Sequence, residues 1–147
     1  PALSTAPIAH EMAMVRANEL NVVFSHNRPD GSNSSTIYID YNYNPARTGY
    51  INYNGVMVKC ASPERSSENI ALTGYYTENS GNNSITTKED LAVKIVEQFK
   101  ASAGHWKDLT NPLYTGVGLG VLLVGDEYVP NMGTAYTCIM TMDKTYG

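Results

Sequence analysis

The stretch FSHNRPDG, residues 24–31, decides how the first part of the chain folds. Pro29 disfavours a helical backbone at the residue before it, and Asp30-Gly31 is a strong turn pair. A helix that arrives from the N-terminal side must therefore end before this turn. The sequence places His26 at the junction of helix and loop, where a side chain can reach an open cleft.

An amphipathic helix is predicted before this stretch, over about residues 4–23. Apolar side chains recur there at helical spacing, namely Ile8, Met12, Val15 and Leu20. Ser4 or Thr5 can cap its first turn, where Pro7 is also acceptable. We therefore expect one helix that leads directly to His26.

A second helix is predicted after Thr87, which is a good capping residue. Asp90 stands at the capping-box position, although its side chain is one carbon shorter than the usual Glu. The apolar side chains that follow form one face, namely Leu91, Ala92, Ile95, Val96 and Phe99. Gly104 is placed to end this helix.

Strands are predicted in short pieces and at the end of the chain. Residues 32–67 are rich in Asn, Tyr, Ser and Gly, which indicates a long ordered loop region. Alternating residues predict brief strands within it at 36–39 and 56–58. Residues 117–124 and 135–142 read as two closing strands, separated by a turn region.

Length and composition favour one folded domain over residues 1–147. Hydrophobic residues make up 42% of the chain and charged residues 16%, which suits a packed core and not a disordered segment. The net charge is −4 and the ten Lys and Arg are scattered, so nucleic acid is not an expected partner. The longest apolar runs are much shorter than the roughly 20 residues that cross a bilayer, so we expect no transmembrane segment.

The two cysteines, Cys60 and Cys138, allow one disulfide or two free thiols. Neither lies in a C-x-x-C pair, which would indicate redox chemistry or zinc. The abundance of Tyr, Asn, Ser, Thr and Gly is common in extracellular proteins. If the protein is exported, we expect the two cysteines to form a disulfide.

Three separated segments carry a family resemblance. They are residues 24–31, Ser67-Glu68-Asn69-Ile70-Ala71, and Ser102-Ala103-Gly104-His105 leading to Asn111-Pro112 and Gly116-Val117-Gly118. In this order they resemble the bacterial branch of the CAP superfamily, which contains cysteine-rich secretory proteins, venom antigens and plant pathogenesis-related proteins. The Arg16-Ala17-x-Glu19-Leu20 pattern in the first helix also suits the family.

The resemblance implies an α/β (α+β) fold, a three-layer α-β-α sandwich around a largely antiparallel central sheet. It also implies a secreted protein, located outside the cell or in the cell envelope. Family members have a further helix before the one that begins near Leu3, and we expect this chain to start after that helix.

The resemblance also implies a cleft with two histidines and acidic residues. Carried over by motif, the histidines are His26 and His105, and the first acid is Glu68. The second acid does not carry over, because Ser102 stands at its position, as in bacterial members of the family. Two neutral imidazoles and a carboxylate suit zinc or another divalent ion, so His26, His105 and Glu68 are the candidate metal ligands. Alternatively, these side chains only hold the surrounding loops together.

Three further residues are expected to support the cleft. The amide of Asn69 is expected to fix the loop that presents Glu68. Arg28 and Asp30 are expected to pin the turn after His26, by pairing with the backbone or with each other.

The leading functional hypothesis is a non-enzymatic binding module, with a metal ion, a lipid, a glycan or a surface protein as its partner and no required cofactor. The alternative is a metal-dependent hydrolase that uses His26, Glu68 and His105, in which a metal-bound water, or a water activated by His105 acting as a base, attacks a substrate and Glu68 orients the reacting groups or exchanges the proton. A third hypothesis is a structural module of the cell envelope. A nucleophile–base pair of Ser102 and His105 is disfavoured, because a Ser near a helix end is commonly a cap and no oxyanion loop is visible.

Overall fold

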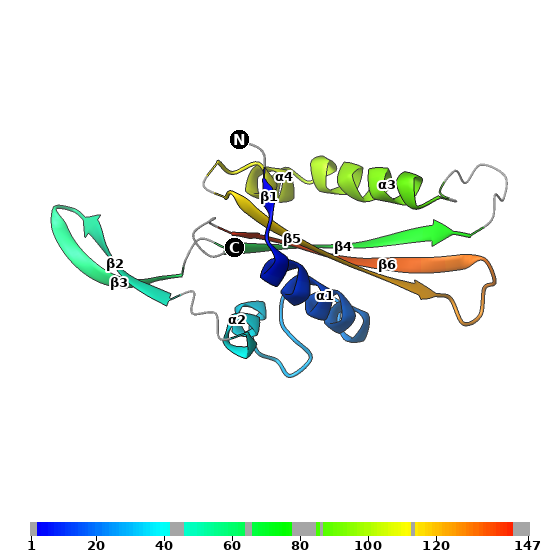
Figure 1. Ribbon diagram of the computed structural model, residues 1–147, viewed down its shortest axis with the longest axis horizontal. Helices are drawn as coiled ribbons and strands as arrows, with labels where there is room; N and C mark the ends of the chain where they lie inside the picture. The colour runs from blue at the N-terminus through cyan, green and yellow to red at the C-terminus, as the bar shows by residue number, and fades with distance from the viewer. Residues whose placement is uncertain are drawn as a thin grey trace.

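The computed structural model describes residues 3–41, 46–63, 66–77, 85, 87–112 and 114–142. The fold is mixed α+β, with a four-stranded mixed sheet, helices that pack on it, and a separate two-stranded sheet (Figure 1). The described helices include none that is long and apolar enough to cross a membrane.

The central sheet has the strand order β1-β5-β6-β4. Its members are β1 (Ser4–Thr5), β4 (Ser66–Tyr76), β5 (Gly116–Gly125) and β6 (Met132–Met142). β6 pairs antiparallel with both β4 and β5, and the short β1 pairs parallel with β5. The two predicted closing strands are therefore confirmed. β4 was not predicted as a strand, and it forms one edge of the sheet.

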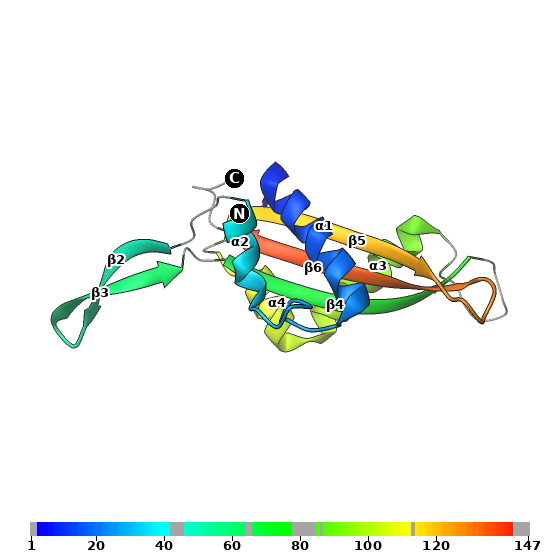
Figure 2. The same cartoon turned by 90° about the horizontal axis from the view of Figure 1, so that it is seen from below.

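Helix α1 (Pro7–Val22) lies across β5 and β6 on one face of the sheet (Figure 2). The approach is close, because a Cβ atom added at Gly118 would collide with the carbonyl group of Ala9. The predicted helix is confirmed, but its predicted cap is wrong. Ser4 and Thr5 belong to β1, and the helix begins after Ala6 with no side-chain cap.

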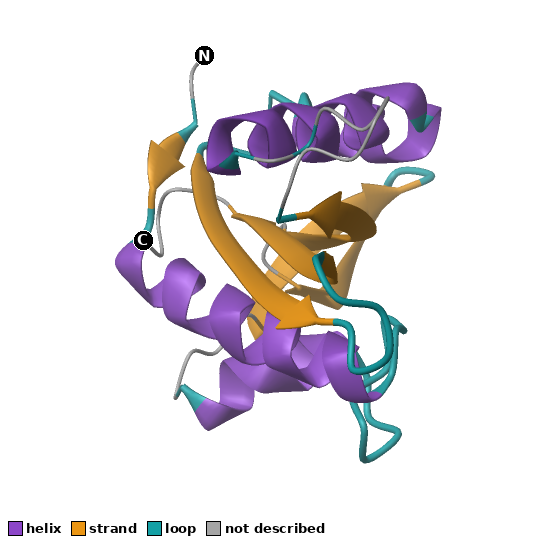
Figure 3. Ribbon diagram, turned by 90° about the vertical axis from the view of Figure 1, so that its right-hand side faces the viewer, coloured by secondary structure: helices purple, strands orange, loops and turns teal. Residues whose placement is uncertain are grey.

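Helices α3 (Lys88–Ala101) and α4 (Ala103–Leu109) lie on the opposite face from α1 (Figure 3). The predicted cap of α3 is confirmed, because Thr87 Oγ1 accepts the backbone N–H of Asp90 at 3.1 Å. The predicted end at Gly104 is wrong. The chain leaves the helix at Ser102, which has an extended backbone, and Gly104 lies inside α4.

Two apolar clusters flank the sheet. The cluster under α1 also takes in residues of α2, and it comprises Ala6, Ala9, Met12, Ala13, Leu20, Ile37, Tyr38, Ile70, Cys138, Met140 and Met142. The cluster under α3 comprises Ala71, Leu91, Ile95, Phe99 and Ala135. Each face of the sheet therefore buries apolar side chains against a helix.

The region predicted as a loop contains regular structure. It holds the 3₁₀ helix η1 (Ser34–Thr36), α2 (Ile37–Asp40) and a hairpin of β2 (Ala46–Tyr53) and β3 (Val56–Pro63) that extends away from the sheet (Figure 1). The strand predicted at 36–39 is wrong, because the Asn33 side chain caps a helical turn there. The strand predicted at 56–58 is confirmed as part of β3. Asn54 and Gly55 turn the hairpin with positive φ angles of 50° and 83°.

Candidate functional site

The centre of the site is a buried ion pair between α1 and β4. Arg16 donates from Nε to Glu68 Oε2 at 2.6 Å and from Nη2 to Glu68 Oε1 at 3.2 Å. The Arg16 side chain is fully buried and the Glu68 side chain is 6% exposed. Two charges buried to this extent are tolerated because they form a bidentate pair with further hydrogen bonds.

The ion pair is the middle of a longer chain of charges. Arg16 Nη1 donates to Glu19 Oε2 at 2.6 Å, and Arg16 Nη2 donates to the carbonyl oxygen of Ser25 at 2.8 Å. Arg28 donates to Glu19 Oε1 at 2.7 Å and to Asp40 Oδ2 at 2.7 Å. We call Asp40, Arg28, Glu19, Arg16 and Glu68 the ionic network. It ties α2 and the loop after α1 to α1 and β4.

The members of the network shift one another's pKa values. Burial raises the pKa of Glu19, but hydrogen bonds from Arg28 and Arg16 outweigh it and leave the pKa below its usual value. Burial lowers the pKa of Arg16, but hydrogen bonds to Glu68 and Glu19 leave it raised. The hydrogen bond to Glu19 is the main cause of the raised pKa of Arg28. These shifts keep the three side chains charged over the physiological range.

His26 joins the network at its exposed end. Its Nδ1 lies 3.0 Å from Glu68 Oε1, and 57% of its side chain is exposed. The loop after α1 and the start of β4 thus bring together two of the three residues expected in the cleft. A carboxylate that fixes one ring nitrogen of a half-exposed histidine is an arrangement common in binding and catalytic sites.

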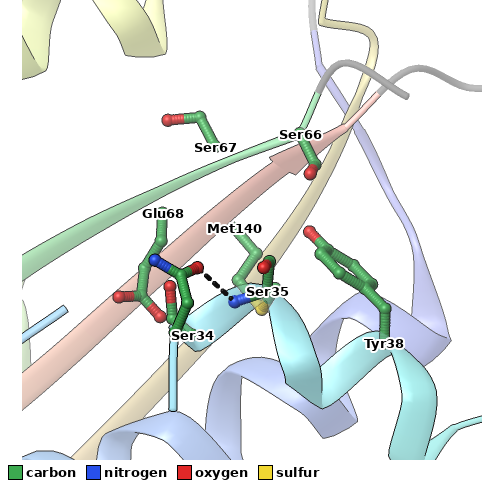
Figure 4. A pocket seen from close by; sticks show the side chains of 8 residues that line it. Ser34, Ser35, Tyr38, Ser66, Ser67, Glu68 and Met140 are labelled. Atoms are coloured by element: carbon green, nitrogen blue, oxygen red, sulfur yellow. Dashed lines mark hydrogen bonds between the residues drawn. The ribbon is translucent and has the colours of Figure 1, made fainter. Parts of the chain in front are cut away.

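A pocket of about 130 Å³ opens beside Glu68, between the η1–α2 segment and β4 (Figure 4). It is lined by Asn33, Ser34, Ser35, Tyr38, Ser66, Ser67, Glu68 and Met140. Four of these residues, Ser34, Ser35, Tyr38 and Ser66, carry hydroxyl groups that can face the pocket, whereas the Ser67 hydroxyl points to Asp108 on the other face of the sheet. Burial raises the pKa of Tyr38 to about 12, although a hydrogen bond with Ser66 lowers it, so the Tyr38 hydroxyl stays protonated at neutral pH. Apart from the Glu68 carboxylate, which is paired with Arg16, the pocket therefore offers uncharged hydrogen-bond donors and acceptors.

His105 and Ser102 lie elsewhere. The His105 ring packs edge-on against Phe99, with the ring centroids 5.4 Å apart, and Phe99 belongs to the cluster under α3. Ser102 joins α3 to α4 and makes no side-chain cap for α4. Within the part of the chain that the structure describes, no three His, Cys, Asp or Glu side chains are arranged to hold a metal ion. The structure brings His26 and Glu68 together, and His105 is not part of this pair.

Asn69 has a different role from the one expected. Side chains alternate along a strand, so Ser67 and Asn69 face away from the α1 side that receives Glu68. The buried Asn69 donates from Nδ2 to Asp108 Oδ2 at 2.6 Å, and the Ser67 hydroxyl donates to the same oxygen. Asn69 therefore holds α4 against β4 instead of fixing a loop. Asp108, the partner of Asn69, was not predicted from the sequence.

The turn after His26 is held partly as expected. Asp30 Oδ1 accepts the backbone N–H of Ser32 at 2.9 Å and its hydroxyl at 2.6 Å, and this hydrogen bonding lowers the pKa of Asp30. Arg28 instead reaches out of the turn to Glu19 and Asp40. Asp30 therefore closes the turn, and Arg28 connects the turn to α1 through Glu19 and to α2 through Asp40.

Cys138 is a buried free thiol on β6, under the site. Its Sγ lies 3.8 Å from Glu68 Oε2, and burial raises its pKa. The side chain of Cys60 lies outside the described part of the chain. The expected disulfide is therefore not formed by Cys138 in this structure.

The spacing of residues in the first helix carries a signal for the burial of Arg16. Met12, Arg16 and Leu20 are spaced by four residues and share one helix face, and all three are buried. A charged residue in the middle of an apolar stripe indicates a buried partner. The partner itself, Glu68, is 52 residues away in the sequence.

No protein-family model, curated protein or solved structure matches this chain.

Proposed function

We propose that this chain is a secreted bacterial domain of the CAP superfamily that binds a small hydroxyl-rich ligand, such as a unit of a glycan, in the pocket beside Glu68 and His26. Under this proposal the sheet and its helices form the three-layer α-β-α sandwich of that family. Two observations support the assignment. The family motifs supply His26 and Glu68, which lie 3.0 Å apart, and helices lie on both faces of the sheet.

The observation that carries the binding function is the lining of the pocket. Serine, tyrosine and asparagine side chains both donate and accept hydrogen bonds, which matches the hydroxyl groups of a sugar. Met140 adds an apolar surface of the kind that the carbon face of a sugar ring can contact. A ligand held by such groups needs no charge of its own.

Calorimetric and NMR titrations with N-acetylglucosamine oligomers, maltotriose and zinc chloride test this proposal. Binding of a saccharide with shifts at the amides of Ser34, Ser35 and Ser67 is the expected result. Ser34→Leu fills the pocket and should abolish binding. Ser102→Leu, between α3 and α4, is the matched control and should preserve it. Saccharide binding that survives Ser34→Leu would contradict the pocket assignment.

The zinc titration separates the remaining hypotheses. Zinc binding without saccharide binding would favour a metal-binding module, and the absence of both would favour a structural role in the cell envelope. Either result would overturn the saccharide proposal.

One observation favours the metal-dependent hydrolase as a second candidate. The contact of His26 Nδ1 with a carboxylate is the relation of a general base to the group that orients it. Hydrolysis of ester or peptide substrates that needs zinc, and is lost in His26→Ala, is the result that this candidate requires. Activity unchanged in His26→Ala would eliminate it.

A further inference from the structure

We infer that Arg16 is the positioning residue of the site: it commits Glu68 to hydrogen bonding, so that Glu68 orients His26 and does not ligate a metal ion. This inference rests on the proposed function for its ligand, since Glu68 lines the proposed pocket and contacts His26. It differs from the metal site implied by the family resemblance, in which Glu68 is a ligand. The disagreement follows from contacts of Glu68 itself.

The acceptor positions of the Glu68 carboxylate are occupied by protein donors. Oε2 accepts Arg16 Nε at 2.6 Å and lies 3.8 Å from Cys138 Sγ. Oε1 accepts Arg16 Nη2 at 3.2 Å and lies 3.0 Å from His26 Nδ1. A carboxylate offers about four lone-pair positions, and these four contacts use them. A metal ion would have to displace one of these donors.

The displacement would be opposed by charge. The Arg16 guanidinium is fully buried and cannot lose its proton in a protein, so it stays positive beside Glu68. A divalent cation on the same carboxylate would face this positive charge with little water between them. The residues present therefore do not fit a metal ion at Glu68.

Arg16 cannot swing aside to make room, because it is held on its other side. Nη1 donates to Glu19 at 2.6 Å and Nη2 donates to the Ser25 carbonyl at 2.8 Å. Glu19 is in turn fixed by Arg28 at 2.7 Å. Three donor directions are used at once, which the planar fork of arginine allows and the single ammonium of lysine does not.

The consequence for His26 is a fixed tautomer. A carboxylate paired with a guanidinium only accepts hydrogen bonds, so Nδ1 of a neutral His26 carries the proton and Nε2 carries the lone pair. The half-exposed ring therefore presents an acceptor. The ligand class that matches it donates a hydrogen bond to Nε2, as a sugar hydroxyl or an amide N–H does.

Long-range ¹H–¹⁵N NMR spectra of the free protein test this inference without a ligand, at a pH where the imidazoles are neutral. The Nδ1–H tautomer is expected for His26, with His105 as the internal reference. Arg16→Lys should turn His26 into a mixture of tautomers, while Lys100→Met, which removes an exposed ion pair, should change nothing. If Arg16→Lys does not fold, Glu68→Gln provides the same readout, since an amide at this position can also donate to Nδ1.

Zinc provides the second readout. Excess zinc chloride should leave the His26 resonances of the unmodified protein unshifted. The inference is overturned if His26 is an Nε2–H tautomer, or if zinc binds the unmodified protein and both His26→Ala and Glu68→Gln abolish that binding. Neither measurement requires a saccharide. The tautomer of His26 and the response to zinc therefore test the role of Arg16 even if the protein binds no saccharide.

Discussion

The two faces of the central sheet are packed in different ways. On the α1 face, small residues let two backbones meet: Ala9 and Ala13 of α1 lie directly over Gly118 and Gly120 of β5. On the α3 face, large side chains fill the space between helix and sheet, namely Leu91, Ile95 and Phe99. The close approach on the first face brings Arg16 within reach of Glu68, so the site depends on small residues that do not touch it.

The faces also differ in how far they are covered. On the α1 face, Gly118 and Gly120 are buried under the helix. On the α3 face, Leu119 and Leu123 of the same strand remain 45% and 44% exposed. Helix α3 contacts β4 and leaves this part of β5 uncovered within the described structure. This difference predicts that truncating a large side chain lowers the free energy of unfolding most on the α3 face. Enlarging a small side chain should lower it most on the α1 face.

The largest effect is expected from removing Phe99 on the α3 face. Phe99→Ala deletes a side chain that is buried against the sheet and contacts the His105 ring, so we expect a loss of about 3–5 kcal/mol in the free energy of unfolding. Urea unfolding followed by circular dichroism measures this loss. Val93→Ala, on the exposed side of the same helix, should cost less than about 0.5 kcal/mol. Equal losses in the two variants would contradict this packing.

A single added methyl group tests the α1 face. In Gly118→Ala the new Cβ would collide with the Ala9 carbonyl, which is backbone and cannot rotate away, so α1 must shift. We expect a loss of about 3 kcal/mol, at the upper end for overpacked cores. Gly74→Ala on β4 meets open space and is the matched control. A Gly118→Ala protein as stable as the control would show that α1 does not lie against β5.

The difference between the faces also explains which elements could be predicted from the sequence. Helix α3 was predicted because its large apolar residues recur at helical spacing and Thr87 is a local cap. Strand β4 was missed because polar residues on both of its faces hide the alternation that indicates a strand. Glu68 points to Arg16 and Asn69 to Asp108, and both partners are far away in the sequence.

The site was predictable only in part, because the partners of its polar side chains are also far away in the sequence. The motifs identified His26 and Glu68, which the structure brings together. Their surroundings depend on tertiary contacts that no local pattern encodes, such as the hydrogen bonds of Arg28 to Glu19 and Asp40. The break at Ser102 is also tertiary, because Phe99 is the last residue of α3 that the core buries.

An acid titration tests the ionic network on the α1 face, with a smaller effect. The folded pKa of Glu19 lies below its unfolded value of about 4.3, so the stability that it contributes is complete above that value and is lost as the pH falls through the folded pKa. The slope from this one group is at most about 1.4 kcal/mol per pH unit.

Unfolding free energies of the unmodified protein and of Glu19→Gln, measured between pH 3 and pH 7, isolate this contribution. The variant should show a shallower slope below about pH 5. Glu97→Gln, which removes an exposed partner of Lys100, should keep the full slope. The network assignment fails if Glu19→Gln and the unmodified protein lose stability in parallel.

The smallest effect is expected at the uncovered part of the α3 face. Leu119→Thr and Leu123→Thr introduce β-branched, strand-favouring side chains, and they remove apolar groups that are already about half exposed to water. Because hydrophobic stabilisation scales with the area that is buried, we expect each change to cost less than about 1 kcal/mol. Urea unfolding at two protein concentrations is the measurement. A loss above about 2 kcal/mol that grows with protein concentration would show that a second copy covers these leucines in solution, since only association makes stability depend on concentration.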